Sequence, residues 1–193
     1  YNTVRSPRSY NSQIGVPLSV WQIGSKTEMA IFEAGISQPD EMIHLEEIIK
    51  PTLGLITNIG EAHQEGFQTI QQKCIEKLTL LKACDCIIYD GDNELICECV
   101  EKLCFGCREI AWSRKDRDKP LYISKIIKGN DFTKIEYTYL QYHSYITIPF
   151  VEDASIENAI HCLAVMLYYN RPPEPITDRM KRLTPVAMRM EVK

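Results

Sequence analysis

Short apolar segments alternate with amphipathic segments over the first half of the chain. The apolar segments have the length of buried strands, whereas the segments between them repeat their apolar positions at helical spacing. Strands are predicted at 29–33, 53–57 and 86–89, and helices at 40–49, 69–83 and 93–103. Asp40 is expected to cap the first of these helices. Strands that alternate with helices of this length predict an α/β fold, with a mostly parallel sheet flanked by helices.

The pattern changes after Arg117. Three segments that alternate apolar and polar residues follow, separated by turn residues, at 121–127, 134–140 and 144–148. They predict a small antiparallel β meander at about 120–150. Helical spacing returns at 154–169 and at 176–183. A further short helix is predicted around Pro17, since proline is tolerated in the first turn of a helix.

Composition and charge narrow the class of protein. The 193 residues are 45% apolar and 25% charged, which is typical of one globular domain. The net charge is −4 and the basic residues are spread along the chain, so nucleic acid is not an expected partner. The sequence contains no apolar segment long enough to cross a membrane, and it does not open with a signal-like leader. Because it also begins without methionine, we expect residues 1–193 to be part of a larger protein.

Eight cysteines raise the question of disulfide bonds. The chain is large enough to fold without them, and the cysteines fall where helices and strands are predicted, so we expect a reduced, cytoplasmic protein with buried free thiols. The alternative is a zinc site formed by Cys97, Cys99, Cys104 and Cys107. On a continuous helix, however, Cys97 and Cys99 point about 200° apart, so both could bind one ion only if the helix were broken.

Polar side chains follow two of the predicted core strands. Glu33 ends the first strand, and Asn58 and then His63 follow the second. In parallel sheets ligands bind beyond the carboxyl ends of the strands, where these side chains would gather. A carboxylate, an imidazole and a third oxygen ligand suit a magnesium ion acting on phosphates. Taken singly, Glu33 and His63 have simpler explanations: Glu33 as a strand-end acid paired with a base, and His63 as a loop histidine bonded to the backbone.

Lys77 occupies an unusual position on the predicted helix 69–83. The apolar residues of that helix fall in one stripe about 80° wide: Ile70, Cys74, Leu78 and Leu81. Lys77 lies about 20° from Ile70, against this stripe. Lysine is among the residues least often fully buried, so its ammonium group must reach solvent, pair with an acid, or be chemically altered.

Together these segments resemble the central domain of the ATP-dependent Mur ligases of peptidoglycan synthesis. The resemblance rests on Phe-Glu-Ala-Gly at 32–35, on Thr-Asn-Ile-Gly-Glu-Ala-His-Gln-Glu-Gly-Phe at 57–67, and on the spacing of Lys77. Segment 10–18 is similar to the Asn-x-x-Gly-Val-Pro segment of the MurF type, which joins D-alanyl-D-alanine to UDP-N-acetylmuramoyl-tripeptide. The resemblance implies a fold related to that of P-loop nucleotide-binding proteins.

Two weaker motifs extend the resemblance over essentially the whole chain. Asn158-Ala159 and Arg189-Met190-Glu191 fall where the family has nucleotide-contacting residues. The resemblance thus implies that Asn158, Arg189 and Asn58 contact the nucleotide. It implies that Asn11 and its neighbour Ser12 line the site for the UDP-sugar peptide.

The resemblance also implies a metal site and a reaction. Glu33 would bind the Mg²⁺ that bridges the ATP phosphates. His63 would bind a second Mg²⁺ together with Lys77, which would be carbamylated and so carry a negative charge. ATP would phosphorylate the terminal carboxylate of the peptide, and the amine of D-alanyl-D-alanine would attack the acyl phosphate and release phosphate.

The sequence departs from the family in one respect. These residues contain no Gly-x-x-x-x-Gly-Lys-Ser/Thr loop, which binds phosphates and lies upstream of this segment in the family. We therefore expect a middle domain that lacks this P-loop and the family's N- and C-terminal domains, and that is inactive alone.

Several alternatives remain open on the sequence. The chain could belong to another Mur ligase or to a folylpolyglutamate synthase-like amide ligase, and its parent could be fused to alanine racemase, as the MurF type is in some bacteria. It could also be a non-catalytic scaffold with this fold. The presence of Glu33, His63 and Lys77 together argues against the loss of a catalytic site.

Overall fold

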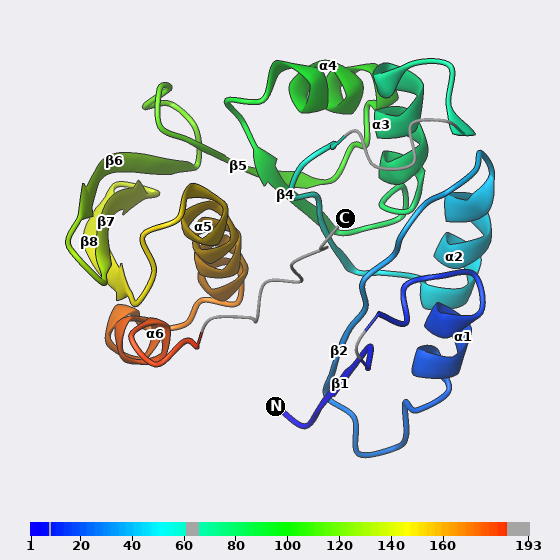
Figure 1. Cartoon of the computed structure of the whole chain (residues 1–193), viewed down its shortest axis with the longest axis horizontal. Helices are drawn as coiled ribbons and strands as arrows, with labels where there is room; N and C mark the ends of the chain where they lie inside the picture. The colour runs from blue at the N-terminus through cyan, green and yellow to red at the C-terminus, as the bar shows by residue number, and fades with distance from the viewer. Residues whose placement is uncertain (8, 61–65, 185–193) are drawn as a thin grey trace, which may run out of the picture. The chain divides into compact units, whose positions relative to one another are not determined.

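The computed structural model describes residues 1–7, 9–60 and 66–184 (Figure 1). The chain divides into two compact units. The first unit comprises Tyr1–Ile87 and Glu94–Arg108, and the second comprises Ile88–Asn93 and Glu109–Lys193. In the described part of the chain, no helix is long and apolar enough to span a membrane.

The first unit contains a two-stranded parallel sheet and four helices that pack in chain order. Strands β1 (Thr3–Arg5) and β2 (Met29–Ile31) pair in parallel. Helix α1 contacts α2, α2 contacts α3, and α3 contacts α4. The helices are α1 (Gly15–Val20), α2 (Glu41–Ile49), α3 (Ile70–Thr79) and α4 (Glu94–Leu103). Strand β3 (Leu53–Leu55) lies between α2 and α3 in the chain.

A small apolar cluster holds α1 and α2 together with the loops beside them. It is made of Val16, Ile36, Met42, Leu45 and Phe67. Each such side chain, once buried, stabilises the fold by about 1.5–3 kcal/mol. Ile36 lies in the loop after β2, and Phe67 lies in the segment before α3. The cluster therefore fixes both of these segments against the helices.

The loop before α2 is organised by Glu41. Its carboxylate accepts hydrogen bonds from Ser37 N at 2.6 Å, Ser37 Oγ at 2.9 Å and Gln38 N at 3.1 Å. Asp40 occupies the N-cap position in a left-handed conformation (φ 66°) and makes no capping hydrogen bond with its side chain. The prediction that Asp40 caps this helix is therefore right in position and wrong in mechanism, because Glu41 binds the backbone N–H groups of the preceding loop instead.

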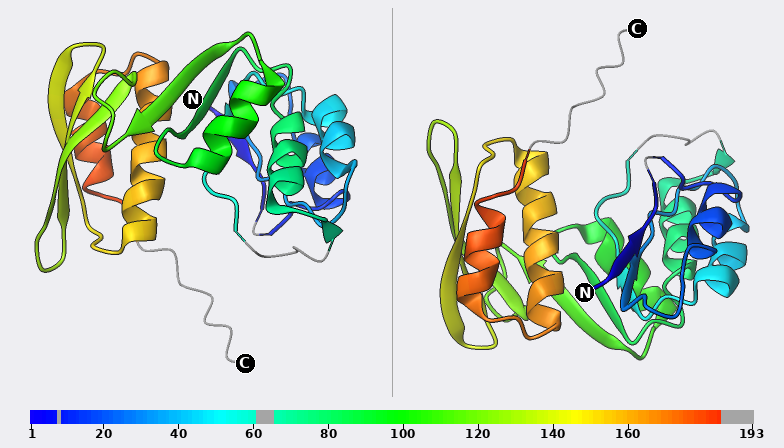
Figure 2. Two further views of the ribbon diagram at one scale, coloured as in Figure 1. Left: turned by 90° about the horizontal axis from the view of Figure 1, so that it is seen from above. Right: turned by 90° about the horizontal axis from the view of Figure 1, so that it is seen from below.

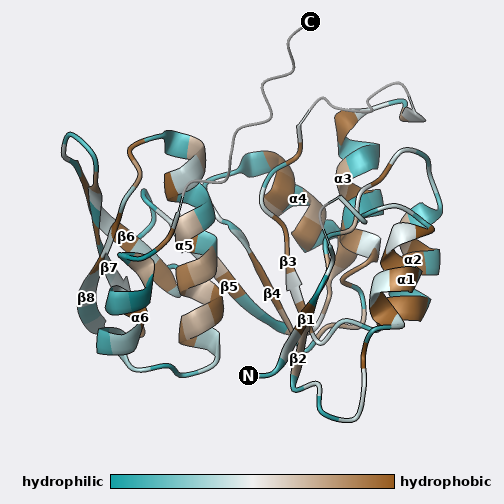
Figure 3. Cartoon of the chain, turned by 60° about the horizontal axis from the view of Figure 1, so that its bottom comes forward, coloured by the Kyte–Doolittle hydropathy of each residue, from teal (hydrophilic) through white to brown (hydrophobic). Residues whose placement is uncertain are grey.

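The larger sheet has six strands in the order β3-β4-β5-β6-β7-β8. The strands that follow β3 are β4 (Cys86–Asp90), β5 (Arg108–Ser113), β6 (Leu121–Lys128), β7 (Thr133–Tyr139) and β8 (Tyr142–Ile148). Strands β5 and β6 pair in parallel, and β6, β7 and β8 form an antiparallel meander. Apolar residues dominate the buried strand β4 (Figure 3). The predicted α/β class and the meander are both confirmed.

In the second unit, helices α5 (Asp153–Tyr168) and α6 (Pro173–Met180) lie against one face of the meander (Figures 1 and 2). The strand β7 alternates buried and half-buried residues along its length, as a strand with one covered face requires. On α5, Ile156, Ile160 and Leu163 recur at helical spacing and are fully buried. The core of this unit thus lies between the meander and the two helices.

A polar pair is buried in the core of the second unit. Trp112 Nε1 donates a hydrogen bond to His161 Nδ1 at 3.1 Å, and the rings meet edge to face with centroids 5.4 Å apart. His161 is 2% exposed, and burial lowers its pKa from 6.5 to about 4. Only the neutral imidazole has an unprotonated ring nitrogen, so only this form can accept the hydrogen bond from the indole N–H at Nδ1.

This pair predicts a dependence of stability on pH. Because the folded-state pKa of His161 lies below its unfolded value, the unfolded chain takes up the proton first as the pH falls. The stability that neutral His161 contributes is complete above pH 6.5 and is lost as the pH falls toward 4. We expect the free energy of unfolding, measured by urea denaturation, to lose about 2 kcal/mol from this residue between pH 7 and pH 5. His161→Gln keeps an acceptor for Trp112 but does not titrate, so it should remove this part of the pH dependence; an unchanged pH dependence would contradict the assignment.

A second prediction concerns the close approach of Gly66 to the loop before α2. A Cβ at Gly66 would overlap Ser37 O, so the backbone must move to accept any side chain there. Gly66→Ala should lower the free energy of unfolding by about 1–3 kcal/mol, measured by thermal denaturation. In the control Gly24→Ala, an added Cβ meets no heavy atom within 4 Å, and the change should stay within about 0.5 kcal/mol. Equal effects at the two glycines would refute the steric argument.

Candidate functional site

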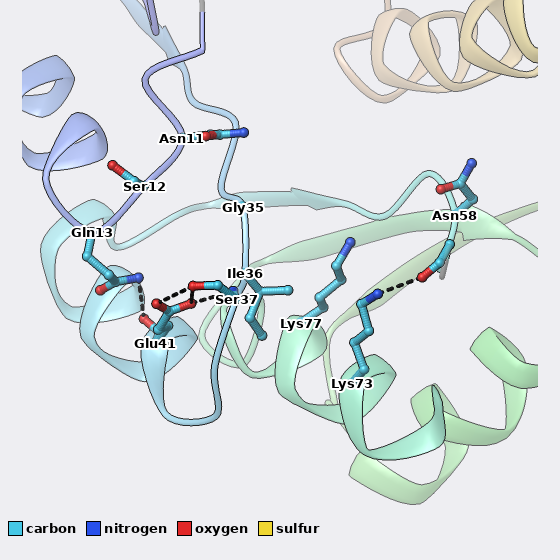
Figure 4. A pocket seen from close by; sticks show the side chains of 11 residues that line it. Asn11, Ser12, Gln13, Gly35, Ile36, Ser37, Glu41, Asn58, Lys73 and Lys77 are labelled. Carbon is cyan, nitrogen blue, oxygen red and sulfur yellow. Dashed lines mark hydrogen bonds between the residues drawn. The ribbon is translucent and has the colours of Figure 1, made fainter. Parts of the chain in front are cut away.

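A pocket of about 410 Å³ lies within the first unit (Figure 4). It is formed by residues 11–13, the loop 35–37 with Glu41, the segment after β3, and one face of α3. Of the residues predicted from the sequence, Asn11, Ser12, Asn58 and Lys77 line it together. The segments that follow β2 and β3 therefore both line this pocket, although Glu33 is not among its lining residues and His63 lies outside the described residues.

Asn11 links the segment before α1 to the segment that follows β2. Its carbonyl oxygen accepts a hydrogen bond from Gly35 N at 2.7 Å, and its Nδ2 donates to Glu33 Oε1 at 3.1 Å. A Cβ at Gly35 would lie 3.1 Å from Asn11 Nδ2, so the two segments are in close contact. Asn11 thereby orients the Glu33 carboxylate, which is exposed beside the pocket.

Lys77 is half-buried on the pocket face of α3. Burial is the main cause that lowers the pKa of its amine, and the charge of Lys73 lowers it further. Cys74 and Glu33 act in the opposite direction, which places Glu33 close enough to Lys77 for their charges to interact. The sequence-based expectation that Lys77 does not lie on the solvent face of this helix agrees with this position.

Lys73 was not predicted from the sequence. It lies one turn before Lys77, lines the same pocket, and is 2% exposed. Its Nζ donates a hydrogen bond to Gly60 O at 2.6 Å. The signal that could have found it is its spacing of four residues from Lys77, which puts the two side chains on one side of the helix.

The remaining predicted residues lie in different places. Ser12 Oγ accepts a hydrogen bond from Gly15 N at 3.1 Å, so this hydroxyl also supports the start of α1. Asn158 is exposed on α5, in the second unit. His63 and Arg189 lie outside the described residues, so the roles predicted for them stay predictions.

No three His, Cys, Asp or Glu side chains come together as a metal-binding group among residues 1–7, 9–60 and 66–184. Mg²⁺, however, is usually held by one or two carboxylates, with water and substrate phosphates completing its shell. Glu33 fits such a role because its carboxylate is exposed beside the pocket and oriented by Asn11. Glu33 can therefore supply one oxygen ligand to a hard cation that is bound with phosphates.

None of the eight cysteines, all of which lie in the described part of the chain, forms a disulfide bond. Cys99 is buried on α4 and its Sγ points to Gln71 O at 3.9 Å, whereas Cys97 is half-buried. Helix α4 is continuous from Glu94 to Leu103, so the break that a shared zinc ion would require is not present there.

Comparison with known proteins places this chain in a family. Residues 1–166 match the family model of the Mur ligase middle domain. The chain is 27% identical, over 199 residues, to the UDP-N-acetylmuramoyl-tripeptide–D-alanyl-D-alanine ligase of Bacillus subtilis (strain 168). That match covers 100% of this chain and 41% of the relative, so the chain spans about two fifths of that protein's length.

Two solved structures show the same fold. MurF from Acinetobacter baumannii superposes with a TM-score of 0.84 at 18% identity, over 96% of this chain and 41% of that chain. MurF from Thermotoga maritima, solved in complex with ADP, gives a TM-score of 0.81 at 17% identity, over 96% of this chain and 43% of that chain. By its match to the family model and by its fold, the chain belongs to the Mur ligase middle-domain family.

Proposed function

We propose that this chain is the central part of an ATP-dependent ligase that joins D-alanyl-D-alanine to UDP-N-acetylmuramoyl-tripeptide in the cytoplasm. Family membership and the name of the Bacillus subtilis relative support the substrate pair. The observation that carries the proposal is the pocket in which Lys77 faces segments that follow two strands, with the Glu33 carboxylate close by. Because the chain spans two fifths of its relatives' length, other parts of the protein would complete the substrate sites.

Glu33 and Asn11 have defined tasks in this proposal. The Glu33 carboxylate supplies an oxygen ligand to the cation that accompanies the ATP phosphates, and Asn11 holds that carboxylate in place. Mg²⁺, when bound, would neutralise phosphate and carboxylate charge while the acyl phosphate forms. Asn11 and Ser12 also lie on the wall of the pocket, where they can contact the UDP-sugar peptide.

Lys77 would act as a carbamate. In that form its side chain carries a negative charge and two oxygen atoms, which with His63 would bind a second Mg²⁺. Asn58, which lines the same pocket, together with Asn158 and Arg189, would contact the nucleotide. A half-buried amine with a lowered pKa is suited to this modification, because the neutral amine is the form that reacts with CO₂.

The first test is turnover by the full-length protein. Phosphate release should require ATP, Mg²⁺, UDP-N-acetylmuramoyl-tripeptide and D-alanyl-D-alanine together. Lys77→Ala should lower kcat/KM by about 100-fold, and added formate, which replaces the carbamate, should restore part of it. Lys82 is exposed, so Lys82→Ala should leave turnover unchanged.

The outcomes separate the competing functions. If phosphate release requires a different acid and amine, the protein is still a ligase and the proposed substrates are wrong. A full-length protein that releases no phosphate with any acid and amine pair would instead favour a scaffold role.

A second test addresses the metal. Glu33→Gln removes the charge but keeps an acceptor, so it should raise the Mg²⁺ concentration needed for half-maximal phosphate release by about 10–100-fold. The matched control is Glu47→Gln, which changes an exposed carboxylate on α2. An unchanged Mg²⁺ dependence in Glu33→Gln would show that Glu33 is not a ligand of the cation.

A further inference from the structure

Two lysines lie on the pocket face of α3, one turn apart. Figure 4 shows Lys73 and Lys77 side by side, and both line the pocket. Like charges four residues apart on a helix repel each other, and they do so more strongly where water is excluded. Two ammonium groups at this place therefore destabilise each other.

The two side chains differ in how firmly they are held. Lys73 is 2% exposed and its ammonium group donates to Gly60 O at 2.6 Å, so its position is fixed. Lys77 is half-buried, and its amine faces the pocket. The amine of Lys77 is thus the more accessible of the two, whereas the ammonium group of Lys73 is held by Gly60 O.

Carbamylation would reverse the charge relation between them. The neutral Nζ of Lys77 attacks the carbon of CO₂ and forms an N–C bond. One C=O π pair moves onto oxygen, and a proton leaves the nitrogen for a solvent base. The product carries one negative charge, so repulsion between two cations becomes attraction between an ammonium group and a carbamate.

We propose that Lys73 is a positioning residue whose ammonium group pairs with the carbamate of Lys77 and stabilises it. This inference rests on the proposed function, because it assumes that Lys77 is carbamylated. It adds a residue that the sequence did not single out, a buried lysine that lines the same pocket as Lys77. The charge of Lys73 also contributes to the lowered pKa of Lys77, which favours the amine that reacts.

The direct test is the occupancy of the carbamate. The full-length protein is equilibrated with ¹³C-bicarbonate, and the carbamate carbon is followed by NMR, with Lys77→Ala to identify its signal. Lys73→Gln keeps an N–H donor for Gly60 O but removes the charge, and it should raise the bicarbonate concentration for half occupancy about tenfold. Lys73→Arg keeps the charge and should restore most of the occupancy. The control Lys82→Gln should behave as the wild type.

A second measurement, formate rescue of Lys77→Ala, uses two different substitutions at Lys73, so it does not depend on a single Lys73 variant being folded. In Lys77→Ala, formate would occupy the place of the carbamate and pair with Lys73. Combining Lys77→Ala with Lys73→Gln, or with Lys73→Met, should raise the formate concentration for half-maximal rescue of phosphate release about tenfold. Thermal denaturation of each variant is the control for folding.

Three outcomes decide the inference. Weaker carbamate occupancy in Lys73→Gln with recovery in Lys73→Arg supports it. The same bicarbonate dependence in Lys73→Gln and in the wild type overturns it, whatever the ligase activity. A wild-type protein with no Lys77 carbamate signal also overturns it, and phosphate release then shows separately whether the proposed ligase function survives.

Discussion

The pocket depends on the contact between Asn11 and the end of β2. One backbone hydrogen bond, from Gly35 N to Asn11 O at 2.7 Å, ties the segment before α1 to the segment that carries Glu33. The amide of Asn11 then reaches the Glu33 carboxylate. Gly35 permits this approach because a side chain there would press on Asn11. A contact between residues distant in sequence therefore sets the orientation of the acid beside the pocket.

The apolar cluster beneath this contact explains why it persists. Ile36 and Phe67 anchor the loop after β2 and the segment before α3 to the same helices. Glu41 holds the intervening loop through Ser37, and Gly66 lies against the carbonyl of that serine. Much of the pocket wall is thus built from loops, and the loop after β2 is fixed by a buried side chain and by backbone hydrogen bonds. Such support is what a binding site needs in order to keep its geometry.

Part of this arrangement could be predicted from the sequence, for identifiable reasons. Alternation of apolar strands and amphipathic helices located most elements. The strand-end rule singled out Asn58, and the helical wheel singled out Lys77; both line the pocket. Strand β1 was missed because three residues carry no periodicity, and β5 was missed because its first residues, Arg108 and Glu109, are polar and exposed. Both strands are specified by pairing with neighbouring strands, which a local pattern does not contain.

Lys73 escaped prediction for a different reason. A helical wheel ranks positions by the apolar residues around them, and by that measure Lys73 lies about 60° outside the predicted apolar stripe of α3. Its burial depends on Gly60 O, which belongs to a segment 13 residues earlier in the chain. The spacing of apolar residues along a helix does not predict a hydrogen bond to a segment outside that helix.

The charge of Lys73 links the energetics of the site to the proposed modification of Lys77. Removing an ammonium group from water costs several kcal/mol even after the surrounding structure relaxes. The hydrogen bond from Lys73 Nζ to Gly60 O offsets part of that cost. A negative charge on the neighbouring side chain would offset more of it, and Lys77, on the same helix face, would acquire one by carbamylation. The buried ammonium group and the proposed carbamate would therefore stabilise each other.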